Sequence, residues 1–488
     1  MTVKQFLKTV LSFSILLLLN ISIYGQTKFA GSSDIFGRRV FIKNKGQFDN
    51  ILPHNPIIDY VYSKDDEQVF FNKQGITYFL QKKYAISHEQ RESMEHGKKV
   101  IVKPSKKAFV NVSWENSNPN VELVVSEKQT YYQSFGDEKY KSDCYKKITY
   151  KNIYDHIDIE YLFTNEREDG IKYNVILHPG AHVEDIKIKY TGDVNKITLK
   201  EGNVVIKTPV LNITELAPTS FQEGIKIESG FTIKDNIISF TVNNYDPSKE
   251  LTIDPWVVNI TFADNNYAYD VDYDYSGSLY VYGGSGPFLI SKFSSSGTLL
   301  WTFSGTVPSI SWTSNYVGDY VGNFIVDKIT GKTYTGEGFN YGTRIIRLNA
   351  LGIYDNFVSS VISNWEEVWD MGYRCSDGAI FGMGGSTTAN TSAGILNTTS
   401  GAILPQNFTG VFNTQQDIVS HTIDPNGNVF VINACDPIPS LDNIILKINA
   451  TFNGNDWVVP SLYTSFNESD NKNYPGHQQI ILLMVLMR

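Results

Sequence analysis

A hairpin motif that recurs about every fifty residues constrains the fold of this chain more than any other feature. Its first copy, Asp270–Gly284, reads DVDYDYSGSLYVYGG, with alternating runs on either side of an Asp/Ser/Gly turn. Alternation of period two around such a turn predicts a β-hairpin. In four successive units a glycine precedes an aromatic residue by three positions: Gly277 and Tyr280, Gly331 and Tyr334, Gly378 and Phe381, and Gly427 and Phe430. An all-strand repeat of this length is typical of β-propeller blades.

Each unit also contains a later strand and turn, which complete the pattern of a four-stranded blade. These segments are Leu289–Gly297, Arg344–Gly352, Ala393–Gly401 and Ile444–Gly454. Aromatic side chains suited to packing between blades are Trp301, Trp312, Trp365, Trp369 and Trp457. Four blades make an incomplete propeller, because an open array leaves one blade face uncovered and an edge strand exposed. We therefore expect either an incomplete chain or another structure that pairs with the open end.

The distribution of charge indicates a domain boundary near residue 257. The 488-residue chain has a formal net charge of −9, and the residues after Trp256 carry 9 Lys and Arg against 19 Asp and Glu. A chain of this length predicts two or three domains. We assign residues 38–257 to a β-rich module and residues 258–474 to the propeller-like repeats. The acidic second half argues against a nucleic-acid partner, since phosphate binding requires clustered positive charge.

The N-terminus has the pattern of a secretory signal peptide, which we place at residues 1–25. Lys4 and Lys8 flank the start of an apolar stretch, Val10–Ile23, and Gly25 before Gln26 offers a cleavage point. A retained membrane anchor is the alternative, but the stretch is short for a spanning helix and polar residues follow it. We therefore expect a protein that leaves the cytoplasm and has no integral membrane span after signal removal.

The first module is a succession of short strands and turns. FIKNKGQF, at Phe41–Phe48, opens it, and ELTIDPW, at Glu250–Trp256, closes it. Ile157, Ile159 and Tyr161 alternate with polar residues, as in a half-buried strand. Residues 82–107 are strongly charged and predict a surface loop or short helix. About a dozen short strands without periodic helices predict a sandwich-like β-module.

The order of motifs in this module resembles that of a known bacterial domain. The segments FIKNKGQF, KQGITYFL, YKNIYDHIDIEYLF, IKYNVILHPGAHVEDIKIKY, ELAPTSFQEG and ELTIDPWV follow one another as in the β-rich domain that precedes SBBP β-propeller repeats. That domain occurs in large secreted proteins of the Bacteroidetes, and DYSGSLYVYGG is similar to the SBBP repeat itself. The resemblance implies export by the type IX system and an association with adhesion or gliding. It supplies no catalytic residues, and no Thr-Tyr-Leu-Gly-Gly segment precedes the blades here.

Three alternating aspartates in the first blade, Asp270, Asp272 and Asp274, suggest a calcium site as one interpretation. Alternate carboxylates converge on a hard cation only when the backbone bends into a loop. In a straight strand they share one face, and the later units do not repeat the triplet. We therefore interpret them as the solvent face of a scaffold strand, and predict no metal and no cofactor.

Acidic and aromatic residues cluster in the third unit, where Glu366, Glu367 and Asp370 lie beside Trp365 and Trp369. Paired carboxylates with aromatic residues suit sugar hydrolysis. They also suit an acidic blade edge, which we favour, because no nucleophile elbow, phosphate loop or dinucleotide fingerprint is present. The sequence therefore predicts no catalytic residues, and a polysaccharide-acting propeller enzyme is the alternative.

The histidines do not form a metal-ligand pattern. Those in the charged segment lack the HExxH spacing that places two histidines on one helical turn; the candidates are His88, Glu89, Glu92 and His96. His178 and His182 are separated by Pro179-Gly180, which would break a helix that carried both. We expect a turn histidine and a surface histidine.

The three cysteines, Cys144, Cys375 and Cys435, fit neither a disulfide framework nor a metal motif. We interpret them as isolated, mostly buried thiols, with a disulfide between Cys375 and Cys435 as the alternative. After Tyr474 the chain reads PGHQQIILLMVLMR, which has no blade pattern. We expect residues 475–488 to be a terminal core strand or the product of a truncated or shifted reading frame.

Together these features predict an all-β protein with a sandwich-like N-terminal module followed by an incomplete β-propeller of about four blades. The predicted function is that of a secreted or cell-surface binding or scaffold protein without enzymatic activity. Its expected partners are surface proteins or glycans.

Overall fold

The computed structural model describes most of residues 35–460, and its elements there are β-strands and a short 3-10 helix. The structure does not describe residues 1–34, 55, 65–66, 83, 85–89, 91–100, 102, 164–170, 259–267, 284–287, 306, 308–322, 337–343, 360–364, 366, 386–391, 408–415, 425, 436–443, 449–454 and 461–488. The signal-peptide prediction and the 475–488 tail fall on these residues. Among the described residues, no helix is long and apolar enough to cross a membrane.

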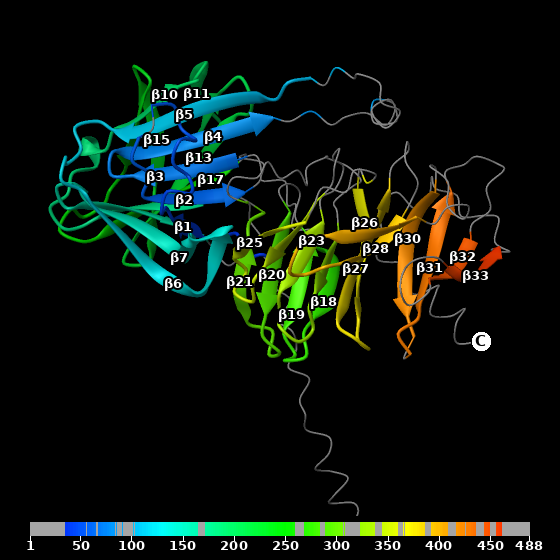
Figure 1. The fold of residues 1–488 in the computed structure, drawn as a ribbon. Helices are drawn as coiled ribbons and strands as arrows, with labels where there is room; N and C mark the ends of the chain where they lie inside the picture. Colours follow the sequence, from blue (N-terminus) through cyan, green and yellow to red (C-terminus); the bar gives the residue numbers. More distant parts are fainter. Residues whose placement is uncertain are drawn as a thin grey trace, which may run out of the picture.

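Two parts lie side by side in Figure 1: an N-terminal module, coloured blue to green, and an array of blades, coloured green to red. The strands of the module are β1 (Phe41–Lys43), β2 (Tyr60–Lys64), β3 (Glu67–Asn72), β4 (Gly75–Lys82), β5 (Lys106–Trp114), β6 (Glu122–Phe135), β7 (Asp137–Tyr154), β8 (Ile157–Leu162), β9 (Ile171–Leu177), β10 (Ile188–Gly192), β11 (Lys196–Lys200), β12 (Asn203–Lys207), β13 (Ile213–Gln222), β14 (Ile225–Ile227), β15 (Ser229–Lys234), β16 (Ile237–Val242) and β17 (Leu251–Val258). The 3-10 helix η1 (Val183–Asp185) precedes β10.

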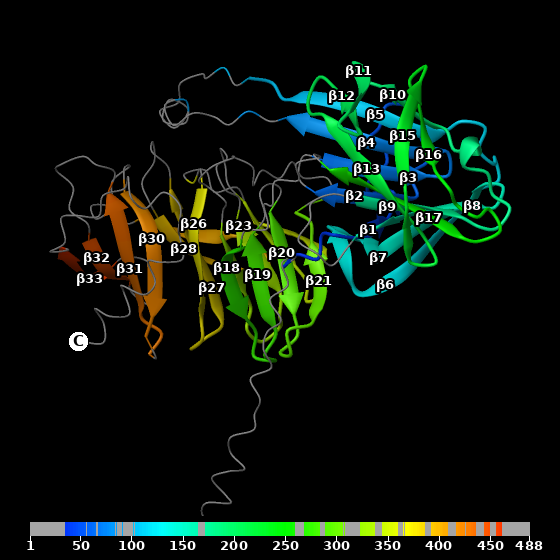
Figure 2. The ribbon, with the colours of Figure 1, turned by 180° about the vertical axis from the view of Figure 1, so that it is seen from behind.

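One antiparallel ladder runs through the module and folds back on itself. It passes along β15-β16-β10-β5-β4-β3-β2-β1 and continues along β7-β8-β9-β17-β13-β12-β11. Strands β2 to β5 face the viewer in Figure 1, whereas β15 to β17 face the viewer from behind in Figure 2. The module is therefore a two-layered, sandwich-like structure built from one continuous sheet.

Alternating side chains fill the space between the two layers. In β8, Ile157, Ile159 and Tyr161 are buried while their neighbours are half-buried. Strand β9 has the same alternation, so the two strands present adjacent apolar rows to one core. Burying each large apolar side chain contributes roughly 1.5–3 kcal/mol. The period-two pattern of the sequence is thus the pattern of core packing.

Four antiparallel sheets of four strands follow the module. Blade 1 contains β18 (Ala268–Tyr273), β19 (Leu279–Gly283), β20 (Leu289–Phe293) and β21 (Leu299–Phe303); blade 2 contains β22 (Phe324–Val326), β23 (Thr333–Gly336), β24 (Ile345–Leu348) and β25 (Tyr354–Val358). Blade 3 contains β26 (Glu367–Arg374), β27 (Ala379–Gly385), β28 (Ser392–Leu396) and β29 (Ile403–Asn407); blade 4 contains β30 (Gln416–Ile423), β31 (Val429–Cys435), β32 (Ile444–Ile448) and β33 (Asn455–Pro460).

The repeated glycine closes the first hairpin of every blade. Gly277, Gly331, Gly378 and Gly427 have φ values of 83°, 67°, 73° and 82°, a region in which glycine carries no steric penalty. The aromatic residue three positions later is buried in the second strand of each blade. The hairpins expected from this motif are therefore present in all four blades.

Aromatic and aliphatic side chains pack between successive blades. Tyr282 of blade 1 stacks on Phe324 of blade 2, with ring centroids 5.3 Å apart. Trp301 and Trp365 are fully buried at the first and second blade contacts. This confirms the packing role expected for these two tryptophans, whereas Trp312 and the side chain of Trp457 lie outside the description.

The outer edge of blade 1 is paired with the N-terminal module. Strand β21 runs parallel to β6, with Trp301, Thr302 and Phe303 opposite Tyr132, Gln133 and Ser134. The Ser134 hydroxyl donates a hydrogen bond to the carbonyl of Gly352, in a turn of blade 2. The edge strand that an open array would expose is therefore covered by the same chain.

We predict that Gly352→Ala destabilises the junction much more than Gly224→Ala. Both glycines have positive φ, so each substitution costs about 1–2 kcal/mol of backbone strain. A Cβ on Gly352 would also lie 2.5 Å from the Trp301 ring, whereas a Cβ on Gly224 would meet nothing within 4 Å. This overpacking should lower the free energy of unfolding of Gly352→Ala by a further amount of about 1–3 kcal/mol. Urea unfolding followed by tryptophan fluorescence measures the difference. Equal losses in the two variants would contradict this account of the junction.

Candidate functional site: the axis of the blade array

The first strands of the blades lie next to one another along the axis of the array. Strand β18 contacts β22, β22 contacts β26, and β26 contacts β30. This arrangement brings together Asp270 of blade 1, Asp370 of blade 3 and His421 of blade 4, which we name the axial cluster. His421 Nδ1 lies 2.6 Å from Asp370 Oδ2, and the charge of Asp270 acts on His421.

Small and aromatic neighbours hold His421 in position. A Cβ on Gly372 would lie 2.7 Å from His421 Nε2, so the imidazole requires glycine at this position of β26. Phe381 presents its ring at 76° to the imidazole, with centroids 5.2 Å apart. Asp370 is itself 7% exposed. The ion pair is therefore built into the contact between blades 3 and 4.

Burial and charge shift the titration of the axial cluster. Burial raises the pKa of Asp270 to about 6, and the nearby charges of Asp370 and Asp272 add to this effect. Burial lowers the pKa of His421, but the charge and hydrogen bond of Asp370 outweigh it, so that pKa is raised overall. The cluster thus combines an imidazole paired with Asp370 and a carboxyl group, that of Asp270, whose ionised form is disfavoured by burial.

Asp272 connects blade 1 to blade 2. Its carboxylate pairs with the ammonium of Lys328 and accepts a hydrogen bond of 2.8 Å from the Val326 amide. The side chains of Asp272 and Lys328 are 14% and 8% exposed. This is a buried ion pair between two sheets, so removing one partner leaves the other charge uncompensated.

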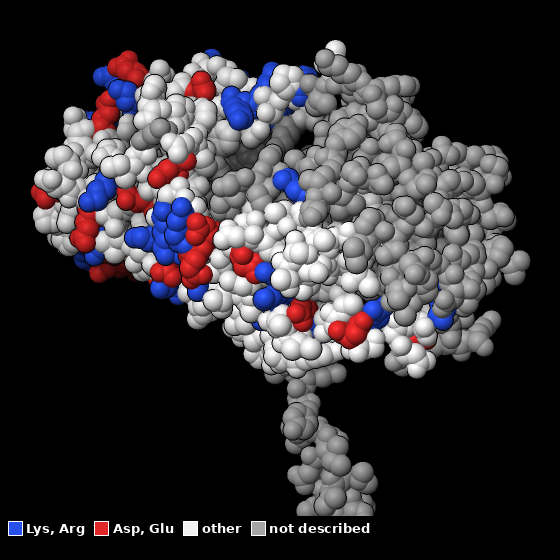
Figure 3. All heavy atoms as spheres, in the orientation of Figure 1, with Lys and Arg blue, Asp and Glu red and all other residues white. Residues whose placement is uncertain are grey.

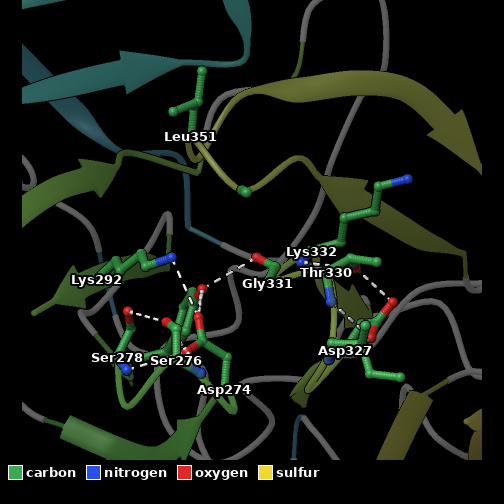
Figure 4. A network of polar contacts seen from close by, with 12 residues as sticks. Asp274, Ser276, Ser278, Lys292, Asp327, Thr330, Gly331, Lys332 and Leu351 are labelled. Atoms are coloured by element: carbon green, nitrogen blue, oxygen red, sulfur yellow. Dashed lines mark hydrogen bonds and ion pairs between the residues drawn. The ribbon is translucent and has the colours of Figure 1, made fainter. Parts of the chain in front are cut away.

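Asp274 organises the turn of blade 1 and its contact with blade 2 (Figure 4). It accepts hydrogen bonds from the amides of Ser276 and Ser278 at 2.9 and 3.1 Å and from the Tyr280 hydroxyl at 2.8 Å. Lys292 Nζ lies 3.3 Å from the carboxylate. Burial raises the pKa of Asp274, but these donors and Lys292 outweigh burial and hold the pKa at about 2.

The aspartate triplet therefore diverges. Asp270 contributes to the axial cluster, Asp272 binds blade 2, and Asp274 caps a turn, so the expected solvent face is wrong. Asp274 is only 4% exposed and the Asp272 side chain 14%, whereas Asp270 is half-buried. Among the described residues, no group of three His, Cys, Asp or Glu side chains is placed to hold a metal ion.

The acidic and aromatic residues at the start of blade 3 do not form one site: some lie in the core between blades and one lies at the axis. Trp365 is fully buried in the contact between blades 2 and 3, and Trp369 packs against the contact between blades 3 and 4. Asp370 belongs to the axial cluster. Glu366 and the side chain of Glu367 lie outside the described residues. Sequence reasoning did not link Asp370 to His421, because they are 51 positions apart.

Two of the other histidines, His178 and His182, lie in turns of the N-terminal module. His178 contacts Glu250 and Asp158 at 3.1 and 3.2 Å, and His182 precedes η1. These positions match the expected turn and surface histidines, whereas the candidates His88, Glu89, Glu92 and His96 lie outside the description.

The cysteines have different environments. Cys144 is buried, but Cys375 is an exposed free thiol, so burial was wrongly expected for it. The structure thus has no disulfide at Cys375. The side chain of Cys435 lies outside the described part of the chain.

A buried carboxylate also lies in the core of the N-terminal module. Glu215 is 1% exposed and accepts hydrogen bonds from the hydroxyls of Tyr173, at 2.7 Å, and Tyr190. Burial raises the pKa of Glu215, although these hydrogen bonds oppose the effect. Because both tyrosines come from other strands, Glu215 joins layers of the module and is a structural group.

Charges of both signs are interspersed on the described surface. In Figure 3, blue and red side chains lie next to one another over the N-terminal module. Lys128 pairs with Asp143 at 2.9 Å and Lys139 with Asp137 at 3.5 Å, both at exposed positions. On the face that Figure 3 shows, the described charges of the two signs are therefore mixed.

The fold is that of an all-β protein in which a sandwich-like module is joined to an incomplete propeller, and the axial cluster lies in the propeller part. Residues 41–256, which run from β1 into β17, match the model of a family described as a domain of unknown function, DUF7948. No curated protein matches this chain.

Several solved structures show weak similarity. Sqt1 of Saccharomyces cerevisiae is 9% identical with a TM-score of 0.27, and the match covers 70% of this chain and 88% of Sqt1. A Bacteroides fragilis protein described as a 6-phosphogluconolactonase is 11% identical with a TM-score of 0.26, covering 81% and 96%. A eukaryotic initiation factor is 9% identical with a TM-score of 0.27, covering 73% and 93%. These TM-scores are too low to carry an argument.

We predict that Asp270→Asn flattens the pH dependence of stability. The pKa of Asp270 is about 6 in the folded protein against 3.8 ordinarily, so the folded state binds this proton more tightly than the unfolded state. Its contribution to stability is therefore largest below about pH 4 and is lost as the pH rises through about 6. Two pKa units correspond to about 3 kcal/mol. The decrease in the free energy of unfolding with rising pH, measured by urea unfolding, should therefore be smaller by about this amount in the Asn variant. Asp235→Asn, at an exposed turn, should keep the wild-type profile; an identical profile for Asp270→Asn would refute the prediction.

We predict that Asp272→Asn destabilises the protein with or without calcium. Lys328 then stays buried without its counter-charge, a loss of about 3–5 kcal/mol. The double variant Asp272→Asn with Lys328→Met should recover much of this loss, since it removes both charges. Thermal unfolding with calcium and with a chelator measures both effects. A calcium-dependent stabilisation that Asp272→Asn abolishes would instead show a cation site.

Proposed function

We propose that this protein is a secreted or cell-surface binding scaffold without enzymatic activity, with surface proteins or glycans as partners. The observation that carries the proposal is the β6–β21 pairing, which makes blade 1 and the N-terminal module a single sheet. A junction through backbone hydrogen bonds fixes the two parts relative to each other. Such a body can present blade loops and module loops to one large partner.

The use of charged residues supports a scaffold. The Asp272–Lys328 and Asp370–His421 pairs connect blades, and Arg347 pairs with Asp355 within blade 2 at 2.7 Å. Catalytic groups instead need a reacting atom within reach of an unengaged acid or base. These side chains stabilise contacts between strands and sheets.

The proposed location outside the cytoplasm rests on the N-terminal sequence. The Lys4 and Lys8 charges, the apolar stretch that follows, and the resemblance to SBBP-associated modules support export by the type IX system. Adhesion or gliding at the surface of a Bacteroidetes-type cell is the process that we propose for it.

A polysaccharide-acting enzyme is a second candidate, favoured by the axial cluster. Asp270 titrates near pH 6 while Asp370 is paired with His421, so two carboxyl groups differ in environment at one axis. Different environments are what an acid and a base require. The paired imidazole argues against it, because it occupies the carboxylate that would act as the base.

A polysaccharide panel separates the two functions. We expect the purified protein to retain one or more cell-surface polysaccharides or surface proteins in a pull-down, without release of reducing ends from any polysaccharide. Asp370→Asn and Glu367→Gln should leave this binding in place, and Asp235→Asn serves as a surface control. Release of reducing ends that Asp370→Asn or Glu367→Gln abolishes would establish the enzyme instead.

A further inference from the structure

Two strands of the N-terminal module project beyond the strands that flank them. Strand β3 pairs with β4 as far as Leu80, and β10 pairs with β5 as far as Val110. Strands β4 and β5 pair with each other further, up to Lys82 opposite Lys106. Figure 1 shows these ends of β4 and β5 projecting from the module. We name the described residues 81, 82, 84, 103 and 105–107 the basic arm.

The basic arm carries positive charge that the described carboxylates do not pair. Its exposed lysines are Lys82, Lys103, Lys106 and Lys107. None of the four forms an ion pair with a carboxylate of the described residues. Lys82 and Lys106 lie directly opposite each other, and like charges in a cross-strand pair are destabilising. The arm therefore contains a repulsion that the folding of the module does not require.

Aromatic rings of the hairpin attract three of the four ammonium groups. Lys103 Nζ and Lys82 Nζ lie 4.0 and 5.9 Å from the centre of the Tyr84 ring. Lys107 Nζ lies 5.9 Å from the centre of the Phe79 ring. The face of an aromatic ring attracts a cation within about 6 Å of its centre. The rings therefore favour positions of these ammonium groups close to the arm.

The lysines lie on both faces of the arm. Successive residues of a strand point to opposite faces, so Lys106 and Lys107 diverge. Lys82 shares the face of Lys106, because the two are directly opposite. The four residue steps from Lys103 to Lys107 span at most about 14 Å. A linear and flexible polyanion can contact both faces over this length, whereas a flat membrane surface can contact only one.

The charge of the arm contrasts with that of the whole protein. The chain has a formal net charge of −9, so a polyanion is repelled by the molecule as a whole and needs a local positive region to bind. Residues 82–107, which join β4 to β5, contain eight Lys and Arg against three Glu. The segment between the two strands therefore does not cancel the charge of the arm.

The side chains of the arm suit a polysaccharide better than a nucleic acid. Its described basic residues are lysines, which lack the planar fork with which arginine reads base edges. Tyr84 offers a ring for stacking a base, but that ring already lies against Lys103. A lysine ammonium is a point charge that pairs with a carboxylate or sulfate group in many orientations.

We propose that the basic arm binds an acidic polysaccharide, with Lys82, Lys106 and Lys107 contacting its carboxylate or sulfate groups. An anion between Lys82 and Lys106 replaces their repulsion with two attractions. This inference rests on the proposed binding function and names the class of its glycan partner.

Binding of polygalacturonate and of dextran sulfate to the full chain tests the proposal, with neutral dextran as the reference. We expect binding of at least one of the two acidic polymers, weaker at high salt because exposed charges are screened. Lys82→Gln combined with Lys106→Gln should weaken this binding about tenfold, since each exposed ion pair contributes up to about fivefold. The urea midpoint of this double variant should not fall, because the change removes a repulsive pair.

Lys73→Gln combined with Lys234→Gln is the matched control. Both lysines are exposed, and Lys73 lies in the turn before β4, at the opposite end of that strand from Lys82. The registers of β15, β16 and β10 place Lys234 near the end of β5 that is remote from Lys106. Seven residue steps, or about 23 Å, separate the two ends of β4. This variant loses the same charge and should bind within about twofold of the wild type, because that distance exceeds two screening lengths.

Three results would overturn the proposal. Equal weakening in the two double variants would show an effect of net charge alone. Tighter binding to double-stranded DNA or to phosphatidylglycerol vesicles than to either acidic polysaccharide would assign the arm to that partner. If neither acidic polymer binds while the pull-down still retains surface proteins or neutral glycans, the arm is not the binding site and the scaffold function stands. A pull-down that retains no partner at all contradicts the proposed function itself.

Discussion

The parallel pairing of β6 with β21 is the contact on which the arrangement of the whole molecule depends. It spans three residue pairs, yet it unites the N-terminal module and blade 1 in one sheet. It also creates the site where Phe36 and Gly37 lie, because the Gly37 carbonyl accepts a hydrogen bond from Tyr131 of β6 and the Phe36 carbonyl accepts one from Thr302 of β21. The two strands are separated by most of the module in sequence, so the pairing is a long-range contact. An exposed blade edge, which invites association with other chains, thereby becomes an internal strand.

The first hairpin of most blades is stabilised by a local interaction. A carboxylate oxygen accepts amide hydrogen bonds in the turn before the glycine with positive φ. Asp274, Asp327 and Asp424 each accept two amide hydrogen bonds within their turns. In blade 1 the cap also reaches across the sheet to Lys292, which lies over the ring of Tyr280. In blade 3 the corresponding turn instead contains an ion pair between Arg374 and Asp377, at 2.5 Å. The looser sequence of the third unit is thus a different turn within the same blade.

The sequence predicted what local chemistry determines and missed what distant strands determine. Glycine spacing located the hairpins, and alternation located β8, because both patterns arise within a few residues. The second half of β6 was not predicted, since Tyr132, Gln133 and Ser134 do not alternate between apolar and polar residues. Gln133 and Ser134 are buried because β21 pairs with this part of β6 and Gln133 donates a hydrogen bond to the Gly37 carbonyl. Likewise, the exposure of Cys375 and its proximity to Tyr275 of blade 1 depend on how blades approach the axis.

The three aspartates of blade 1 show why a correct strand assignment does not fix function. Asp270 and Asp272 alternate along β18 and Asp274 follows it in the turn, but β18 is the innermost strand of its blade, so the three residues meet different neighbours. Its first carboxylate meets blades 3 and 4, its second meets Lys328 of blade 2, and the third meets the turn of its own blade. A strand at the rim of a sheet would place the same triplet in water, where it would be available to a cation. Position relative to the axis, which is set by packing of whole blades, therefore converts a potential ligand set into three structural contacts.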